Sequence, residues 1–123
     1  MSSTLHKKKG FRRLVLAIGY SWKGLVYAFR NEEAFRVECM LTIVVVPAAF
    51  YFGSSALETA VLLLATALVL IAELTNTAIE AAVDRVSTEH HTLAGAAKDA
   101  ASAVVLVSII AWSIIWGCIL LLS

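Results

Sequence analysis

The sequence has few residues that interrupt helices and few charges. Its 123 residues include one proline and six glycines. Only 15% of them are charged, whereas soluble domains carry about 25%. The two cysteines, Cys39 and Cys118, lie in separate apolar runs, which favours neither a disulfide framework nor a zinc site. These scarcities exclude collagen-like, disordered and soluble globular classes, and they favour long membrane helices.

Motifs of soluble nucleotide-binding proteins are also missing. Gly19 and Gly24 have the spacing of the two P-loop glycines, but Leu25 and Val26 stand where Lys and Ser or Thr are required. There is no dinucleotide-binding fingerprint and no protein-kinase motif set. The net charge of +1 gives no indication of a nucleic-acid partner. Any nucleotide site in this chain must be built in another way.

Apolar residues make up 60% of the chain, and the mean hydropathy is +0.85. A helix needs about 20 apolar residues to cross a bilayer. The apolar stretches predict an all-α, polytopic membrane protein with three transmembrane helices, over about residues 35–53, 57–84 and 98–122. We expect residues 1–123 to form a single membrane domain.

A further helix is predicted before the first span, over about residues 5–30. Its apolar residues recur every three or four positions: Phe11, Leu14, Ile18, Trp22, Leu25 and Phe29. Arg12, Arg13, Lys23 and Arg30 lie off this stripe. The pattern is typical of an amphipathic helix at the membrane surface, with its cations near anionic headgroups. A helix packed on the rest of the protein is the alternative.

The basic residues predict the orientation. Eight of the ten Lys and Arg lie within residues 1–36, whereas the connection at residues 53–58 has none. Arg85 and Lys98 mark the second connection. By the positive-inside rule, the N-terminus and the second connection face the cytoplasm and the C-terminus faces the opposite side of the membrane.

Glu73 is the most informative residue of the chain. It follows the uncharged run Ala60–Ala72, and a carboxylate at that depth is costly enough to suggest a function. A structural acid paired with a cation on another helix is the alternative. Asn76, Glu80 and Asp84 follow at spacings of three, four and four, so they share a helix face with Glu73. This stripe runs from lipid depth to the cytoplasmic water and suits a reaction between a lipid and a soluble phosphate donor.

A second set of acids, Glu32, Glu33 and Glu38, precedes and enters the first span. On its own, this set of acids is typical of a solvent-exposed junction between two helices. Beside the stripe on the second span, these acids become candidate ligands for Mg²⁺, which prefers carboxylate and phosphate oxygens. His90 and His91 lack a third ligand at a spacing that would indicate zinc.

Several motifs together resemble the bacterial integral-membrane diacylglycerol kinase family. They are GYSWKGL (19–25), NEEAFRVE (31–38), AELTNTAIEAAVDR (72–85), EHH (89–91) and AKDAASAVVL (97–106). The resemblance covers the chain from about Phe11 into the third span. It implies a homotrimer of three-span protomers with a surface helix and sites between subunits. It also implies a location in the bacterial inner membrane, with the C-terminus in the periplasm. It also implies Mg²⁺- and ATP-dependent phosphorylation of diacylglycerol to phosphatidic acid.

The resemblance assigns roles residue by residue. Glu73 matches the general base, and Glu32 and Glu80 match the magnesium ligands. The positions implied to bind ATP are Arg13, Tyr20, Glu32, Glu80, Glu89, His90, His91, Lys98 and Asp99. Those implied to bind the lipid are Arg13, Ser21, Trp22, Ala34, Phe35, Glu38, Glu73 and Ser102, and Asn76 lines the site. Glu33 adds an acid beside Glu32, and His90 stands where relatives often carry Tyr.

Other functions compete with this one. Undecaprenol kinases are relatives that tend to lack a tryptophan at the position of Trp22 and to carry His at that of Glu38, so both residues favour diacylglycerol. A small transporter or proton relay would use the same buried acids, although the chain lacks inverted repeats. A non-enzymatic assembly factor is the third alternative.

Overall fold

A computed structural model describes residues 2–86 and 92–122, and their side chains from Lys9 onward. Every element in these ranges is a helix: α1 (Ser2–Asn31), α2 (Glu33–Phe52), α3 (Ala56–Val86) and α4 (Thr92–Leu122). The prediction of an all-α protein is confirmed. Three of the helices, α2, α3 and α4, are long and apolar enough to cross a bilayer, as the hydropathy predicted.

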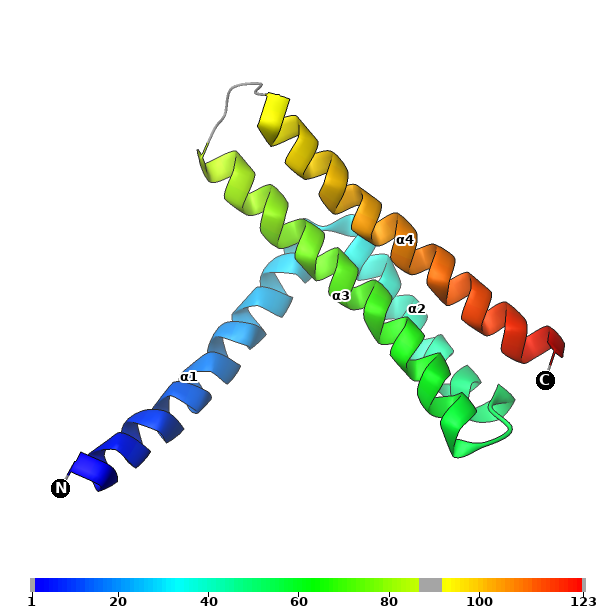
Figure 1. Ribbon diagram of the computed structural model, residues 1–123, viewed down its shortest axis with the longest axis horizontal. Coiled ribbons are helices and arrows are strands. Elements are labelled where there is room, and N and C mark those ends of the chain that lie inside the picture. Colours follow the sequence, from blue (N-terminus) through cyan, green and yellow to red (C-terminus); the bar gives the residue numbers. More distant parts are fainter. Residues whose placement is uncertain (1, 87–91, 123) are drawn as a thin grey trace.

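The three apolar helices lie side by side, and α1 projects away from them at a steep angle (Figure 1). The chain enters α2 at the inner end of α1, so the start of α2 lies against the middle of α3 rather than at its end. The C-terminus and the turn between α2 and α3 share one end of the bundle. The last turns of α3 and the first turns of α4 therefore extend beyond the junction of α1 and α2 (Figure 1).

Helices α3 and α4 form the most extensive packing in the chain, and they run together along most of their length (Figure 1). Small side chains are buried between the helices: Ala28, Ala49, Ala65, Ala72 and Ala101 are at most 4% exposed. Small residues allow helix backbones to approach closely, which is how membrane helices gain packing energy. The alanine-rich spans are therefore suited to packing on one another.

A tryptophan joins the two long spans. The Trp112 Nε1–H donates a hydrogen bond to the Thr66 Oγ1 at 3.1 Å, and the Thr66 hydroxyl donates to the Leu62 carbonyl at 2.9 Å. The rings of Trp112 and Trp116 stack with centroids 5.2 Å apart. Such bonds between helices are worth about 0.6 kcal/mol on average in membrane proteins.

The turn between α2 and α3 is closed by local hydrogen bonds. The Glu58 N–H donates to the Ser55 Oγ, and the Ser54 N–H donates to the Glu58 Oε1. The first bond satisfies a backbone donor that the first turn of α3 leaves unpaired, and the second satisfies a donor of the turn itself. Gly53 lies where a Cβ atom would collide with Thr59 and with the Ala49 carbonyl oxygen, so the turn requires glycine there.

The junction of α1 and α2 is fixed by Arg36. Its Nη1 donates to the carbonyl oxygens of Phe29 and Arg30, each at 3.0 Å, which caps the end of α1. Glu32 is the single residue between the two helices. It stands at the N-cap of α2, yet its side chain makes no capping hydrogen bond. The carboxyl group of Glu32 is therefore left available for contacts with α3.

Helix α1 keeps its apolar stripe exposed. Phe11, Ile18 and Trp22 are 71%, 62% and 67% exposed, so this part of the face does not pack on the chain's own bundle. At the inner end of the stripe, Leu25 lines a cavity with residues of α3, so the stripe meets the rest of the protomer only there. The surface helix, the homotrimer and the membrane orientation stay predictions.

Candidate active site

Four carboxyl groups from two helices meet near the junction of α1 and α2. Glu32 directly precedes α2 and Glu38 lies in its second turn, and Glu73 and Glu80 come from the second half of α3. Seven residues separate Glu73 from Glu80, or about 10 Å of helix rise, and six separate Glu32 from Glu38. Because α2 and α3 run in opposite directions, Glu38 lies opposite Glu73 and Glu32 lies opposite Glu80.

The deeper pair is Glu38 and Glu73. Glu73 is only 6% exposed, and the two carboxyl groups lie within hydrogen-bonding reach of each other. The Oε2 atom of Glu38 is buried and has no hydrogen-bond partner. A carboxylate only accepts hydrogen bonds, so this contact is favourable when one of the two groups holds a proton. The pair can therefore accept and share a proton.

The outer pair is Glu32 and Glu80. Burial raises the pKa of Glu32 above its ordinary value, and the nearby carboxylates of Glu80 and then Glu73 raise it further. Arg36 opposes this rise with a smaller effect, since its guanidinium is already bonded to carbonyl oxygens. Arg36 and Lys98 offset only part of this negative charge, so the two closely placed acids favour a further positively charged ligand.

Asn76 lies between the two pairs on α3. Its Nδ2 donates a hydrogen bond to the Glu80 Oε1 at 3.3 Å, and its Oδ1 is buried and has no partner. The bond orients the Glu80 carboxyl group, and the Oδ1 remains without a hydrogen-bond partner. That Asn76 lines the site stays a prediction.

The one described ion pair of the chain closes the far end of the polar stripe. The Lys98 Nζ lies 2.5 Å from the Asp84 Oδ1, and the Lys98 ammonium is also close enough to interact with the Glu80 carboxylate. Lys98 thus brings α4 to the same edge of α3. An ammonium group at this position is suited to neutralising phosphate oxygens.

Within residues 2–86 and 92–122, no three acids, histidines or cysteines lie close enough together to hold a metal ion by themselves. Mg²⁺ is usually bound by one or two carboxylates, and substrate phosphates and water complete its coordination. Glu32 and Glu80 supply such a pair of oxygen donors, and they repel each other unless a cation lies nearby. The residues present therefore fit a magnesium ion that arrives with a phosphate ligand.

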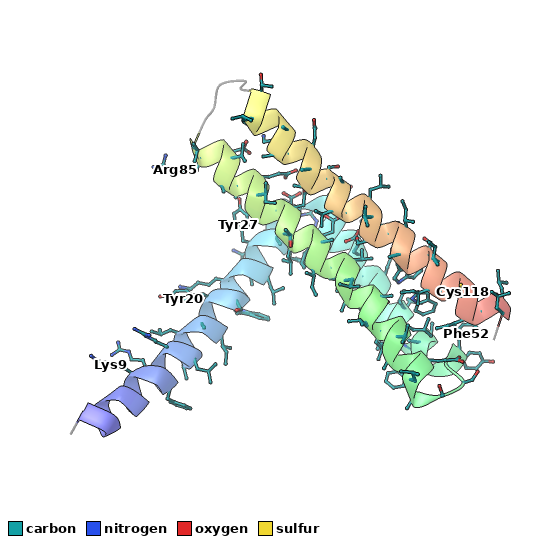
Figure 2. All side chains as sticks on the ribbon, in the orientation of Figure 1. Lys9, Tyr20, Tyr27, Phe52, Arg85 and Cys118 are labelled. Atoms are coloured by element: carbon teal, nitrogen blue, oxygen red, sulfur yellow. The ribbon has the colours of Figure 1, made fainter. Side chains whose placement is uncertain are left out.

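The other predicted site residues are spread more widely. Arg13, Tyr20 and Trp22 are exposed on α1, and Figure 2 shows Tyr20 on the projecting part of that helix, away from α3 and α4. Ala34, Asp99 and Ser102 are exposed, whereas Phe35 is buried. Ser21 lines a cavity of about 450 Å³ between α1 and α3. Glu89, His90 and His91 lie outside the described residues.

Sequence reasoning missed two contacts. It assigned Glu38 to the lipid site without placing it against Glu73, although Glu38 is the one acid inside the first span beyond its first turn. It also gave no role to Thr66 and Trp112. A polar residue at matching depth in two spans is the signal that could have suggested their bond.

Comparison with known proteins identifies the family of this chain. The family described as prokaryotic diacylglycerol kinase matches residues 19–120. The chain belongs to this family.

Curated relatives cover nearly the whole chain. A diacylglycerol kinase from Escherichia coli K12 is 47% identical over 114 residues, 93% of each chain. One from Haemophilus influenzae is 40% identical over 116 residues, 94% of this chain and 98% of the relative. One from Pseudomonas aeruginosa is 45% identical over 112 residues, 91% of each chain.

Family membership confirms two predictions from the sequence. The chain is a lipid kinase, and kinases of this family take a lipid and ATP as substrates. It is also a membrane protein, in agreement with its three apolar helices. The pairs of acids described above therefore lie in the chain of a phosphotransferase, where charge neutralisation and positioning are the main requirements of catalysis.

Proposed function

We propose that this chain phosphorylates diacylglycerol to phosphatidic acid at the cytoplasmic side of the membrane, with ATP as phosphoryl donor. The observation that carries the proposal is the buried Glu73 carboxyl group at the inner end of a polar stripe. It lies against Glu38 and has no cation beside it among the described residues. A lipid hydroxyl reaches this depth, and a nucleotide reaches the outer end of the same stripe.

The proposed reaction is a direct transfer. Glu73 accepts the proton of the primary hydroxyl of the lipid while that oxygen attacks the γ-phosphorus of ATP. The bond from oxygen to the γ-phosphorus forms, the bond from the γ-phosphorus to the bridging oxygen breaks, and ADP leaves. A base within reach of the reacting hydroxyl contributes about 10²- to 10⁴-fold to such a step. Glu38 binds the lipid end of the site and contacts the base.

Glu32 and Glu80 are the proposed magnesium ligands, and Asn76 orients Glu80. When bound, the cation would neutralise charge on the phosphate oxygens. The mutual repulsion of the two carboxylates supports this assignment, since it is relieved by a divalent cation. Lys98 supplies a further positive charge at the same edge of the site.

The remaining residues assigned to the substrates require more than one chain. Arg13 and Tyr20, proposed to contact ATP, lie on a helix that projects away from its own bundle (Figure 2). We propose that three copies assemble so that each α1 reaches a neighbouring site, and that Trp22, Ala34, Phe35 and Ser102 then line the lipid site. Asp99, Glu89, His90 and His91 complete the proposed nucleotide contacts.

The test is an assay of the purified chain with radiolabelled ATP, Mg²⁺ and either diacylglycerol or undecaprenol in mixed micelles. We expect labelled phosphatidic acid and much slower labelling of the prenol. Preferential labelling of the prenol would replace diacylglycerol as the substrate. ATP-independent, Glu73-dependent ion flux in liposomes without any labelled lipid would instead indicate a transporter.

A further inference from the structure

A second cavity lies directly below the deeper acid pair. It has a volume of about 320 Å³, within the range of small-molecule pockets. Side chains of α2, α3 and α4 line it, among them Glu38, Thr42, Val45, Thr66, Leu70 and Trp112. Glu38 is the only charged residue of the lining, so the cavity is suited to an apolar ligand.

The positions of the lining residues along the helices define an upper end and a floor of the cavity. Glu38 and Leu70 lie near the proposed base, whereas Val45 and Thr66 lie one to two turns deeper toward the opposite membrane face. Thr66 is seven residues from Glu73, or about 10 Å of helix rise. The cavity therefore extends roughly 10 Å along the bundle from the level of Glu73.

Trp112 forms the floor and is fixed in place from two sides. Its Nε1–H is bonded to the Thr66 Oγ1 at 3.1 Å, and its ring stacks on Trp116, which is 6% exposed. The Thr66 hydroxyl is itself anchored to the Leu62 carbonyl. A side chain held in this way cannot move aside without losing a hydrogen bond and a ring contact.

We propose that this cavity holds one acyl chain of the lipid acceptor, and that Trp112, held by Thr66, sets the length of chain that fits. The inference rests on the proposed function, because it takes the occupant to be the lipid that Glu73 deprotonates. The cavity is continuous with Glu38, which contacts that base. When one acyl chain of the lipid lies below Glu38, the glycerol hydroxyl of that lipid lies at the acid pair. A longer acyl chain must bend at Trp112.

The first experiment measures chain-length selectivity of the full-length protein in mixed micelles. The substrates are dioctanoylglycerol, dilauroylglycerol and dioleoylglycerol, and the variants are Trp112→Ala, Trp112→Phe and Thr66→Val. Removing the floor should raise kcat/KM for dioleoylglycerol relative to dioctanoylglycerol by about tenfold in Trp112→Ala, the scale of discrimination by one hydrophobic pocket. Thr66→Val should shift the ratio in the same direction by less, and Trp112→Phe should shift it least.

Ile114→Ala is the matched control, since Ile114 lies two residues from Trp112 on α4, is 59% exposed and does not line the cavity. It should leave the ratio unchanged. Equal ratios in Trp112→Ala, Thr66→Val and Ile114→Ala, with wild-type kinase activity intact, would overturn the inference and leave the proposed function standing. Absence of diacylglycerol phosphorylation by the wild-type protein would overturn the proposed function instead.

A second measurement detects binding without turnover, in the Glu73→Gln background. Diacylglycerol brominated near mid-chain is added to vesicles at low mole fraction, and quenching of tryptophan fluorescence is recorded. We expect stronger quenching than with equally brominated phosphatidylcholine, and loss of that difference in Glu73→Gln/Trp112→Phe. Equal quenching by both lipids would show that the cavity accepts any bilayer chain, and no quenching by either would show that a neighbouring copy fills it. Either result overturns the inference.

Discussion

Helix α3 carries glutamates at both of its ends, and their surroundings differ. Glu58 lies at the start of the helix, where its carboxylate accepts the Ser54 N–H and its own N–H is bonded to Ser55. Glu73 lies fifteen residues on, against the carboxyl group of Glu38, and Glu80 lies against that of Glu32. Glu58 thus accepts a hydrogen bond from a backbone N–H, whereas Glu73 and Glu80 each lie beside another carboxyl group.

This difference separates structural from chemical roles. A carboxylate that accepts a backbone N–H at the start of a helix has its hydrogen-bonding capacity used by the fold. A carboxyl group held beside another acid costs stability and is available for a proton or a cation. The first end of α3 therefore supports the fold, and the second supports the reaction.

The largest expected effect comes from exchanging Glu73. Glu73→Gln should lower kcat by about 10²- to 10⁴-fold, because the amide keeps the shape of the side chain and cannot accept the proton. Labelled phosphatidic acid measures the rate, and filter binding of ATP should be unchanged. Glu58→Gln, at the other end of the same helix, should retain nearly full activity. Normal turnover by Glu73→Gln would exclude it as the base.

The outer pair should control the requirement for Mg²⁺. Glu80→Gln should raise the Mg²⁺ concentration for half-maximal activity at least about tenfold, since even groups that hydrogen-bond a metal ligand matter on that scale. Titration of activity with MgCl₂ at saturating ATP gives this value. Glu33→Gln is the control, since Glu33 is exposed beside Glu32. An unchanged titration for Glu80→Gln would remove it from the ligand set.

A polar contact in the other half of α3 should affect stability instead. Thr66→Val removes the hydrogen bond to Trp112 and should lower the unfolding free energy by about 0.6 kcal/mol. Titration with sodium dodecyl sulfate, followed by circular dichroism, measures the change. Ser113→Ala serves as control, because the Ser113 hydroxyl bonds only within its own helix. A large loss of kcat on dilauroylglycerol in Thr66→Val would contradict the assignment of a structural role to the first half of α3 and a chemical role to the second half.

The smallest effect concerns the charge of Glu32. Its pKa is raised in the folded protein by burial and by Glu80, so the charged form opposes folding once the pH exceeds the ordinary value of 4.5. Glu32→Gln should therefore raise the thermal midpoint at neutral pH without divalent cations, and should give no gain well below that pH. Melting curves in detergent at both pH values test the sign. Equal gains at both would exclude the charge as the cause.

Much of the fold follows from local pattern. The three spans are evident because helices in lipid must satisfy their backbone internally, so hydropathy and length suffice to find them. The stripe from Glu73 to Asp84 follows from helical periodicity alone. The pairings of Glu38 with Glu73 and of Thr66 with Trp112 do not, because each depends on the relative axial positions of two helices.

The sequence by itself determined that this chain lies in a membrane, that an acid is submerged in its second span, and that its motifs are those of a lipid kinase. The first two depend on composition and on spacing within one segment, whereas the third rests on the resemblance of several motifs to a known family. Only the tertiary structure decided which acid faces which, that Asn76 orients Glu80, and that Trp112 closes a cavity below Glu38. Such contacts join residues far apart in the chain, and helix packing alone sets their distances.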